Sequence, residues 1–301
     1  MSPVSILVTG AAGYIGSALA RALDPARAIT TDQSAPAAVV GNLAYPRFAR
    51  SLVTPEVETV FHLASLVSGG AEQNFELGTK VNLDATRDLL EACRLAGHRP
   101  KFVFASSIAV YGGAAEIDDA TPPAPRLSYG AQKLVCEILI DDYSRRGYID
   151  GCSLRLPTVM VRPGGANTAV SGWASAIIRE PLAGRDYVCP VRPETTMACI
   201  SVGKVVECFL KAMDLGGDAL GPRRSVLLTG VPVAAREMWH AVRDRSRGRV
   251  TFEPDPRIQA IMDEVPKATC SARAAELGFP HSRDIQEIVR EYEEAAVAHH
   301  G

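Results

Sequence analysis

A glycine-rich turn near the N-terminus constrains the fold of this chain more than any other segment. Gly10-Ala11-Ala12-Gly13-Tyr14-Ile15-Gly16 lies directly between the strand-like run Ser5–Thr9 and the helical pattern Tyr14–Leu23. Glycines at this place permit a tight turn and let the backbone approach a pyrophosphate, whose charge is stabilised at the helix N-terminus. The spacing G-x-x-G-x-x-G is a variant of the dinucleotide-binding fingerprint. The turn therefore predicts a dinucleotide site in a parallel α/β sheet.

The rest of the first half alternates short β-branched runs with longer helical patterns, which is typical of parallel strands joined by crossover helices. Further strands are expected at Ala28–Thr31, Thr59–Leu63, Lys101–Ser106 and Gly151–Leu156, and long helices at Phe75–Ala96 and Ser128–Arg146. Later segments expected to be regular are Trp173–Leu182, Lys204–Met213, Ser225–Leu228 and Val250–Phe252. We predict a doubly wound Rossmann sheet over residues 1–160 and a smaller C-terminal substrate lobe over 161–301, with some later segments returning to the sheet.

An acidic residue stands at the end of the second predicted strand. Asp32 lies sixteen residues beyond Gly16, where a carboxylate can accept hydrogen bonds from the adenosine ribose and would repel a 2′-phosphate. The following Gln33-Ser34-Ala35 contains no Arg or Lys. An Asp that only stabilises the next turn would fit the same position, but that interpretation does not explain the lack of basic residues. We therefore predict NAD rather than NADP as the cofactor.

A tyrosine and a lysine lie about one helical turn apart in Tyr129-Gly130-Ala131-Gln132-Lys133, so both side chains share one helix face. A nearby ammonium favours the phenolate and lowers the pKa of a tyrosine toward neutral pH. Ser107 directly follows the predicted strand Lys101–Ser106, at the sheet edge where ligands bind. A turn or a helix cap is the ordinary role of such a serine. Together with Tyr129 and Lys133, it predicts a site that acts on a hydroxyl or carbonyl group.

The composition limits the classes of partner. Apolar residues make up 47% and charged residues 22%, with a net charge of −2, which argues against nucleic acid or an anionic membrane as the main partner. No apolar run reaches membrane-spanning length, and a strand-like run starting at Val4 leaves no room for a cleaved signal peptide. The seven cysteines include no C-x-x-C pair and are expected to be reduced thiols. We expect a cytoplasmic protein that acts on a small molecule and needs no metal ion.

Taken together, these segments resemble the extended short-chain dehydrogenase/reductase family. The matching motifs occur in the expected order over roughly the first 160 residues. They are Val8-Thr9-Gly10-Ala11-Ala12-Gly13-Tyr14-Ile15-Gly16, His62-Leu63-Ala64-Ser65, Val81-Asn82, Ser106-Ser107-Ile108-Ala109-Val110-Tyr111-Gly112 and Tyr129-Gly130-Ala131-Gln132-Lys133. The resemblance implies a Rossmann fold, bound NAD(P) and a Ser/Tyr/Lys site.

The resemblance also implies roles for individual residues. Those expected to contact NAD are Gly10, Gly13, Tyr14, Ile15, Gly16, Asp32, Asn42, Leu43, Leu63, Ala64, Asn82, Tyr129, Lys133 and Pro157. Asn42-Leu43 stands where an Asp-hydrophobic pair usually contacts adenine, and Asn keeps the acceptor but loses the charge. The expected catalytic residues are Tyr129 as the base, Lys133 at the nicotinamide ribose and Ser107 at the substrate oxygen. His62 is given no catalytic role, because packing at the strand end accounts for it.

Nearly the full length is similar to one branch of that family, the D-erythronate dehydrogenases. The similarity rests on Leu154–Gly164, Ile177–Gly184, Tyr143–Gly147, Glu253-Pro254-Asp255-Pro256 and Leu277-Gly278-Phe279-Pro280. It implies NAD-dependent oxidation of a secondary hydroxyl, at C2 of a sugar acid such as D-erythronate or of a related polyol.

The chain departs from this branch in one segment near the substrate. Where the branch typically carries an Arg, a Trp and a Ser-Pro-Arg, the chain reads Thr195-Thr196-Met197-Ala198-Cys199-Ile200-Ser201-Val202-Gly203. Arg is the natural bidentate partner of a carboxylate, so Thr196 removes that partner unless Arg162 or Arg192 supplies it. The residues expected at the substrate are Ser65, Ser107, Arg162, Asn167, Ser171 and Thr196.

Two other functions would use the same residues. A nucleotide-sugar epimerase or dehydratase that retains NAD would need a diphosphate subsite, for which Arg162, Arg223, Arg224 and the basic run 243–249 are candidates. That run also has the pattern of a solvated surface face. A non-catalytic NAD-sensing regulator is disfavoured, because such proteins commonly lose the Tyr or the Lys. By analogy with the family, helices 75–96 and 128–146 are expected to pair across a two-fold axis in a homodimer.

Overall fold

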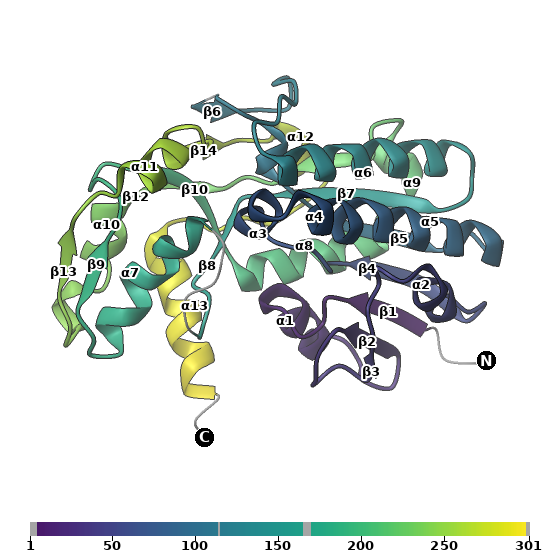
Figure 1. Cartoon of the computed structure of the whole chain (residues 1–301), viewed down its shortest axis with the longest axis horizontal. Helices are drawn as coiled ribbons and strands as arrows, with labels where there is room; N and C mark the ends of the chain where they lie inside the picture. The colour runs from purple at the N-terminus through teal and green to yellow at the C-terminus, as the bar shows by residue number, and fades with distance from the viewer. Residues whose placement is uncertain (1–4, 114, 165–169, 299–301) are drawn as a thin grey trace.

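The computed structural model describes residues 5–113, 115–164 and 170–298, and these ranges contain a central seven-stranded parallel sheet (Figure 1). Its strand order is β11-β7-β5-β4-β1-β2-β3. The strands are β1 (Ser5–Thr9), β2 (Ala28–Asp32), β3 (Val39–Val40), β4 (Val57–His62), β5 (Lys101–Ser107), β7 (Asp150–Leu156) and β11 (Ser225–Leu227). The chain winds in opposite directions from β1, so the loops after β1 and β4 diverge and leave a crevice at the carboxyl ends of the strands. The predicted doubly wound sheet is confirmed.

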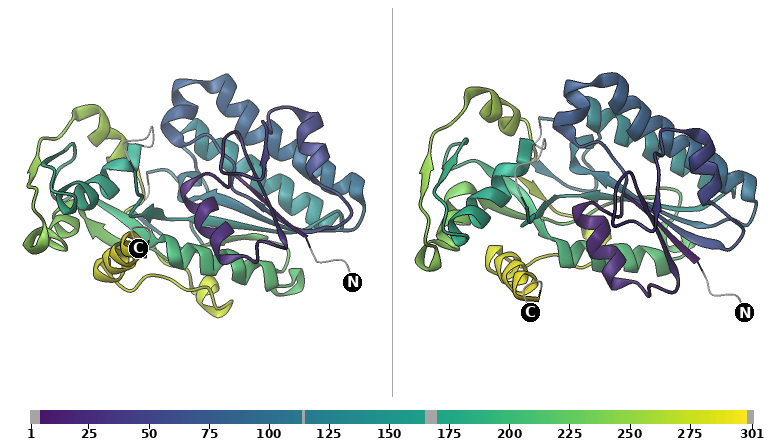
Figure 2. Two further views of the ribbon diagram at one scale, coloured as in Figure 1. Left: turned by 90° about the horizontal axis from the view of Figure 1, so that it is seen from below. Right: turned by 60° about the horizontal axis from the view of Figure 1, so that its bottom comes forward.

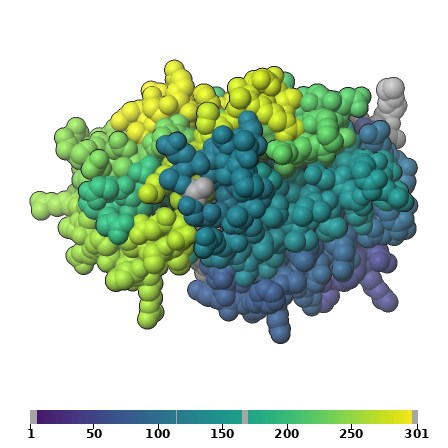
Figure 3. Space-filling model, turned by 90° about the horizontal axis from the view of Figure 1, so that it is seen from above, coloured from purple at the N-terminus to yellow at the C-terminus, as the bar shows by residue number. Residues whose placement is uncertain are grey.

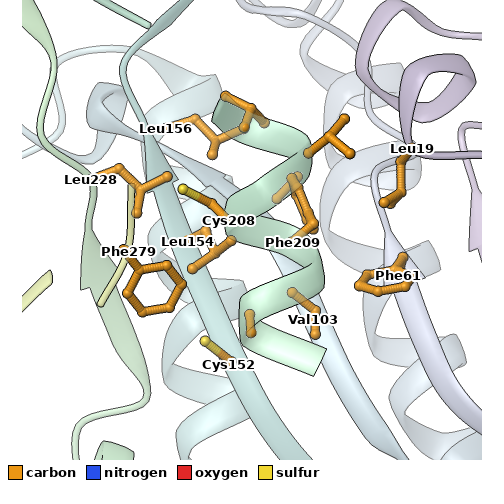
Figure 4. Packing of buried hydrophobic residues seen from close by; sticks show 14 of the residues in the cluster. Leu19, Phe61, Val103, Cys152, Leu154, Leu156, Cys208, Phe209, Leu228 and Phe279 are labelled. Carbon is orange, nitrogen blue, oxygen red and sulfur yellow. The ribbon is translucent and has the colours of Figure 1, made fainter. Parts of the chain in front are cut away.

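Helices cover both faces of the central sheet (Figure 2). Helices α1 (Tyr14–Ala22) and α8 (Val202–Asp214) contact each other on one face, and α2 (Pro46–Leu52), α5 (Ala85–Ala96) and α6 (Ser128–Arg145) lie on the other. This arrangement explains why β5 is buried along almost its whole length. On the α8 face, the ring of Phe209 meets Phe61 edge-on at 6.0 Å, among Val103, Leu154 and Leu156 (Figure 4).

The helix predicted at 75–96 contains an irregular turn. It consists of α4 (Phe75–Gly78), a π-helical segment η1 (Thr79–Asp84) and α5, and α3 (Ser68–Gln73) precedes it. A π-helical turn admits an extra residue and often lies at a functional site. Here it carries Asn82. The other predicted helices and strands agree with the structure within two residues at each end.

A second lobe contains the predicted strand at 250–252 and several strands that the sequence pattern did not predict. Strand β10 (Thr196–Ser201) pairs parallel with β8 (Thr158–Met160) and antiparallel with β12 (Val231–Ala234), while β9 (Tyr187–Cys189) pairs parallel with β13 (Val250–Phe252). The helices around them are α7 (Trp173–Leu182), α10 (Ala235–His240) and α11 (Pro256–Asp263). Most of these strands have only three or four residues, which is too short for a clear alternation of apolar and polar side chains.

The chain returns from this lobe to the central sheet. Strand β11 pairs with β7, and β14 (Ala268–Thr269) pairs with β6 (Glu116–Ile117), so the segment after β5 lies against the last third of the chain (Figure 3). The remaining elements are η2 (Ile108–Val110), η3 (Val170–Gly172), α9 (Gly217–Leu220), η4 (Arg243–Arg245), α12 (Ala272–Glu276) and α13 (Ile285–Ala298). Within the described ranges, every helix is too short or too polar to cross a bilayer.

Candidate active site

A cavity of about 430 Å³ lies where the carboxyl end of β5 meets the second lobe. We call it the Tyr129 cavity. Six residues predicted to bind substrate or cofactor, or to act in catalysis, line it: Ile15, Ser107, Tyr129, Pro157, Arg162 and Ser171. Residues 15, 107 and 129 come from the central sheet domain, and 162 and 171 from the segment leading into the second lobe. The structure therefore brings together groups that are up to 156 positions apart in the sequence.

Close packing between α6 and the turn after β5 sets the relative position of Ser107 and Tyr129. Ser107 is the last residue of β5, and its Oγ accepts a hydrogen bond of 3.1 Å from the backbone N–H of Ala109. The hydroxyl can still donate its own proton, to the Tyr129 oxygen or to a ligand in the cavity. A Cβ atom on Gly130 would lie 2.0 Å from the Ala109 carbonyl oxygen, so only glycine permits this approach of α6.

The half-buried Tyr129 is influenced by three polar neighbours. Burial raises the pKa of its phenol, while side-chain hydrogen bonds with Ser65 and Ser107 and the positive charge of Arg162 lower that pKa. Each of these three groups favours the phenolate, the form that can accept a proton.

Lys133 lies over the ring of Tyr129. Its Nζ donates a 2.8 Å hydrogen bond to the Ala105 carbonyl and lies 4.5 Å from the centre of the Phe104 ring and 5.6 Å from that of Tyr129. The side chain is 2% exposed, and burial lowers the pKa of Lys133 to about 8. The ammonium of Lys133 lies over the Tyr129 ring, and its effect on the pKa of the phenol stays a prediction.

A second cavity, of about 470 Å³, lies beside the glycine-rich turn. We call it the Asp32 cavity. Its lining includes many of the residues predicted to contact NAD, namely Gly10, Gly13, Asp32, Asn42, Leu43, Leu63 and Ala64, together with Ser65. The loop after β4 contributes Ser65 and Leu66 to this cavity and Val67 and Ser68 to the Tyr129 cavity. The two cavities therefore adjoin along the carboxyl ends of the strands, as the two halves of a dinucleotide require.

The glycine-rich turn is shaped as the fingerprint predicts. Gly10 has a φ of +70°, and a Cβ atom there would lie 2.6 Å from the backbone nitrogen of Ala64. A Cβ atom on Gly16 would lie 2.1 Å from the Gly10 carbonyl oxygen. Helix α1 begins without a side-chain cap, so its first N–H groups can bind an anion. These features fit the pyrophosphate of NAD.

Asp32 reaches the cavity and also stabilises the turn. Its Oδ2 accepts a hydrogen bond of 3.0 Å from the Ala12 N–H, and its Oδ1 accepts one of 2.6 Å from the Gln33 N–H. These hydrogen bonds show the role of the carboxylate in the turn. Asn42 likewise lines the cavity while its Oδ1 accepts a hydrogen bond of 2.8 Å from the Ala44 N–H. Contact of either side chain with adenosine stays a prediction.

Asn82 lies behind the site and not at its surface. Its Oδ1 accepts hydrogen bonds from Ser65 Oγ (3.0 Å) and Leu66 N (2.7 Å), and its Nδ2 donates to Leu66 O (3.0 Å) and Gln132 Oε1 (2.8 Å). The side chain is only 1% exposed. Asn82 thus holds the loop that carries Ser65. Its partner Gln132 was not among the residues predicted from the sequence.

His62 is buried between Thr9 and Thr86. Its Nδ1 lies 2.7 Å from the Thr9 hydroxyl oxygen, and its Nε2 lies 2.9 Å from the Thr86 hydroxyl oxygen.

Tyr14 and Arg162 connect the glycine-rich turn to the second lobe. The Tyr14 hydroxyl donates a 2.9 Å hydrogen bond to the Val161 carbonyl, and the Arg162 guanidinium lies 5.7 Å from the centre of the Tyr14 ring. Ile15 lines the Tyr129 cavity from the same turn. The groups that act on the Arg162 charge are Tyr14, Tyr129 and Arg179, and none of them is a carboxylate.

The structure does not bring every predicted substrate residue to the Tyr129 cavity. The Thr196 hydroxyl donates to the Glu194 carbonyl at 3.0 Å, and Met197 lines the cavity instead, because neighbouring strand residues face opposite sides. This placement does not support a substrate contact for Thr196. Arg192 pairs with Asp263 at 2.7 Å on the surface, so it is no substitute for the missing Arg. Asn167 lies outside the described residues.

The other basic candidates for a diphosphate subsite lie away from both cavities. Arg224 pairs with Asp150 at 3.1 Å, and Arg223 donates to the Asp119 carbonyl at 3.1 Å. In the basic run, Arg245 pairs with Glu293 at 2.8 Å and Arg243 with Asp244 at 3.1 Å. These pairs support the interpretation of the run as a surface face.

Comparison with known proteins identifies the family. A model of the NAD dependent epimerase/dehydratase family matches residues 6–222. D-erythronate dehydrogenase from Cupriavidus necator is 41% identical to this chain, and the alignment covers 97% of this chain and 99% of that protein. D-erythronate dehydrogenase from Haemophilus influenzae is 35% identical, and the alignment covers 96% of this chain and 98% of that protein. The crystal structure of a nucleoside-diphosphate-sugar epimerase from Agrobacterium tumefaciens is 33% identical with a TM-score of 0.91, covering 98% of this chain and 95% of that one. The chain belongs to the NAD-dependent epimerase/dehydratase family of extended short-chain dehydrogenases/reductases.

Proposed function

We propose that this chain is an NAD-dependent dehydrogenase that oxidises a secondary hydroxyl of a sugar acid such as D-erythronate or of a related polyol. One observation carries the proposal: Ser107, Tyr129 and Arg162 line the same cavity. Arg162 carries a half-buried charge, and among the described residues Tyr14, Tyr129 and Arg179 are the groups that act on it. A guanidinium in this state is ready to bind a carboxylate in the bidentate manner. The relatives named D-erythronate dehydrogenases support the same substrate class.

The residues of the Tyr129 cavity account for the proton chemistry. NAD, when bound, accepts the hydride that leaves the carbinol carbon. The phenolate of Tyr129 takes the proton of the substrate hydroxyl, and Ser107 donates a hydrogen bond that orients the substrate oxygen. Arg162 holds the carboxylate and also favours the phenolate of Tyr129. Among these residues, Arg162 is the one that selects an acid over an uncharged polyol.

The residues around the Asp32 cavity would hold the cofactor. The N–H groups at the start of α1 would bind the pyrophosphate, and Asp32 the adenosine ribose. Asn42 and Leu43 would contact adenine. Pro157 and Lys133 would contact the nicotinamide end of NAD. We propose NAD over NADP, because the carboxylate of Asp32 would repel a 2′-phosphate.

A substrate screen tests the proposal. The purified protein is incubated with NAD and, one at a time, with aldonic acids of four to six carbons, the matching polyols and a nucleotide sugar. We expect stoichiometric formation of NADH with at least one aldonic acid, and weaker activity with the polyol of the same length. If no acid or polyol reduces NAD while a nucleotide sugar is converted, the proposed function is wrong.

An epimerase or dehydratase acting on a nucleotide sugar is the second candidate. It is favoured by the likeness to the nucleoside-diphosphate-sugar epimerase structure. Such an enzyme turns over without net consumption of added NAD. Of the basic candidates for its diphosphate subsite, only Arg162 lines the Tyr129 cavity, and for this reason we rank the dehydrogenase first.

A homodimer belongs to the same proposal. Helices α5 and α6 lie side by side and expose Leu95 (61%), Val135 (42%) and Ile138 (61%). Pairing of these faces across a two-fold axis would cover apolar surface. Sedimentation velocity should show a dimer that dissociates in Ile138→Asp but not in Val188→Asp, a matched change of an exposed residue in the second lobe.

We also propose a cytoplasmic location. All seven cysteines are free thiols, and six of them are buried. Reduced thiols are typical of the cytoplasm, where NAD is also available. Recovery of the protein in an oxidising compartment after cell fractionation would contradict this.

A further inference from the structure

Tyr14 is a residue of the glycine-rich turn whose side chain has no role in the chemistry proposed above. It is the first residue of α1 and is half-buried. Its backbone belongs to the predicted pyrophosphate site, but its side chain reaches across to the second lobe. There it makes two separate contacts, one with Val161 and one with Arg162.

The hydroxyl of Tyr14 holds the backbone next to Arg162. It donates a hydrogen bond of 2.9 Å to the Val161 carbonyl oxygen. Burial raises the pKa of the Tyr14 phenol, so the hydroxyl keeps its proton and remains a donor. Val161 is only 2% exposed, and a buried carbonyl oxygen is costly to leave without a partner. The hydroxyl therefore fixes the point at which the chain leaves β8 and enters the second lobe.

The backbone of Arg162 itself is fixed by α7. Its N–H donates a 3.0 Å hydrogen bond to the Ser175 hydroxyl, and its carbonyl accepts one of 2.8 Å from Nη1 of Arg179. Both partners lie on α7 and are buried. With the Tyr14 contact, the main chain of residues 161 and 162 is held from α1 and from α7 together. These bonds leave open the direction of the long Arg162 side chain.

The ring of Tyr14 supplies that direction. The Arg162 guanidinium lies over the ring, 5.7 Å from its centre. A ring face attracts the positive charge without using the N–H groups of the guanidinium. An ion pair with a carboxylate of the protein would instead occupy the donors that a substrate carboxylate needs. Stacking on a ring therefore suits a guanidinium that must be held in one direction and still be open to a ligand.

We propose that Tyr14 is a positioning residue, which holds the Arg162 guanidinium in the Tyr129 cavity ready for a substrate carboxylate. This inference rests on the proposed function for the identity of the substrate as an acid. An arginine side chain has many rotamers, and fixing one of them costs conformational entropy. The Tyr14 ring offsets that cost before the substrate arrives. Loss of Tyr14 should therefore weaken the binding of the acid more than it slows the chemical step.

Two substitutions separate the ring from the hydroxyl. Tyr14→Phe keeps the ring and removes the hydrogen bond to Val161, so kcat/KM for the acid should fall roughly threefold to tenfold. Tyr14→Leu removes both contacts and should lower kcat/KM roughly tenfold to a hundredfold, mostly through KM. The NADH dissociation constant should change less than threefold in both variants, since backbone N–H groups bind the pyrophosphate. The kcat/KM for the polyol of the same length, which has no carboxylate, should also change less than threefold.

A double substitution and a matched tyrosine give the controls. If Tyr14 acts through Arg162, Tyr14→Leu should have almost no further effect on kcat/KM for the acid in an Arg162→Met protein. Tyr148 is also half-buried, its hydroxyl accepts a 3.2 Å hydrogen bond from Arg146, and the Arg146 guanidinium lies 5.7 Å from its ring centre. It lines neither the Tyr129 cavity nor the Asp32 cavity. Tyr148→Leu should leave kcat/KM for the acid unchanged.

The position of Arg162 can also be measured without a substrate. Phenylglyoxal reacts with accessible guanidinium groups, and peptide mass spectrometry gives the rate of modification at each arginine. The exposed Arg257 of the same molecule serves as the internal reference. In Tyr14→Leu the covering ring is gone, so the relative rate at Arg162 should rise at least threefold. In Tyr14→Phe the ring remains, and the relative rate should stay within twofold of the wild type.

The outcomes distinguish this inference from the proposed function. If the modification rate rises in Tyr14→Leu but no sugar acid reduces NAD, the proposed function is wrong while the positioning of Arg162 by Tyr14 is supported. An unchanged rate in a folded Tyr14→Leu protein overturns the inference, and so does an equal loss of kcat/KM for the acid and the polyol. If Tyr14→Leu does not fold, Tyr14→Phe decides. A loss specific to the acid supports the inference, and no loss, or an equal loss for both substrates, overturns it.

Discussion

The Lys133 ammonium lies over the face of the Tyr129 ring, 5.6 Å from its centre, and donates its hydrogen bond to the backbone of β5. A positive charge over a ring face is attracted by the ring. Ser65, Ser107 and Arg162 favour the phenolate form of Tyr129. The reactivity of the tyrosine therefore depends on the loop after β4, the end of β5 and the entrance to the second lobe.

Tyr129→Phe should abolish most of the catalysis while leaving the cofactor site intact. Loss of a general base typically lowers turnover by roughly 100-fold to 10,000-fold. We expect kcat for the active sugar acid to fall in this range, with the NADH dissociation constant changed less than threefold. Steady-state kinetics and NADH fluorescence measure the two quantities. An unchanged kcat would show that Tyr129 is not the base.

Arg162→Met should change both substrate affinity and pH dependence. A hydrogen bond to a charged group contributes about 1.5–3 kcal/mol, so kcat/KM for an acid should fall roughly tenfold to a hundredfold. The positive charge of Arg162 lowers the Tyr129 pKa, so its removal raises that pKa. Because the phenolate is the active form, the rising limb of the profile should move to higher pH.

The matched control for this variant is Arg257→Met. Arg257 is exposed and lines a further cavity, which Arg162 also lines. It should leave the rising limb unchanged. Equal shifts in both variants would mean that general surface charge, and not Arg162, sets the Tyr129 pKa.

Asp32→Asn should weaken the preference for NAD. Asparagine keeps an acceptor for only one of the Ala12 and Gln33 N–H groups, and it removes the charge that repels a 2′-phosphate. The ratio of kcat/KM for NAD to that for NADP should fall at least tenfold, since the loss of a charge repulsion of about 1.4 kcal/mol already gives that factor. If the NAD-to-NADP ratio of kcat/KM does not change, Asp32 does not select the cofactor and only stabilises the turn.

Gly16→Ala should disrupt the glycine-rich turn. The added methyl carbon would lie 2.1 Å from the Gly10 carbonyl oxygen, so the turn or the start of α1 must move. We expect a lower melting temperature and at least tenfold weaker NADH binding. The control is Gly216→Ala, where a Cβ atom meets nothing within 4 Å, and it should leave both quantities nearly unchanged. Normal NADH binding by a folded Gly16→Ala protein would contradict the proposed place of the pyrophosphate.

The sequence alone determined the features that depend on neighbouring residues. The turn from Gly10 to Gly16, the strand ending at Asp32 and the shared helix face of Tyr129 and Lys133 follow from local spacing. Because spacing fixes backbone conformation and side-chain periodicity, the strands of the central sheet other than the two-residue β3, and the long helices, were predicted within two residues at each end.

Only the tertiary structure decided which distant groups meet. Neighbouring side chains of β10 face opposite sides, so Met197 lines the Tyr129 cavity while the Thr196 hydroxyl donates a hydrogen bond to the Glu194 carbonyl. Arg162, and not Arg192, enters that cavity, because Arg192 is paired with Asp263. The contacts of Glu137 with Arg155 and Ser106 join residues 18 and 31 positions away. Such pairings depend on strand register and helix packing across the whole domain, and no local pattern in the sequence encodes them.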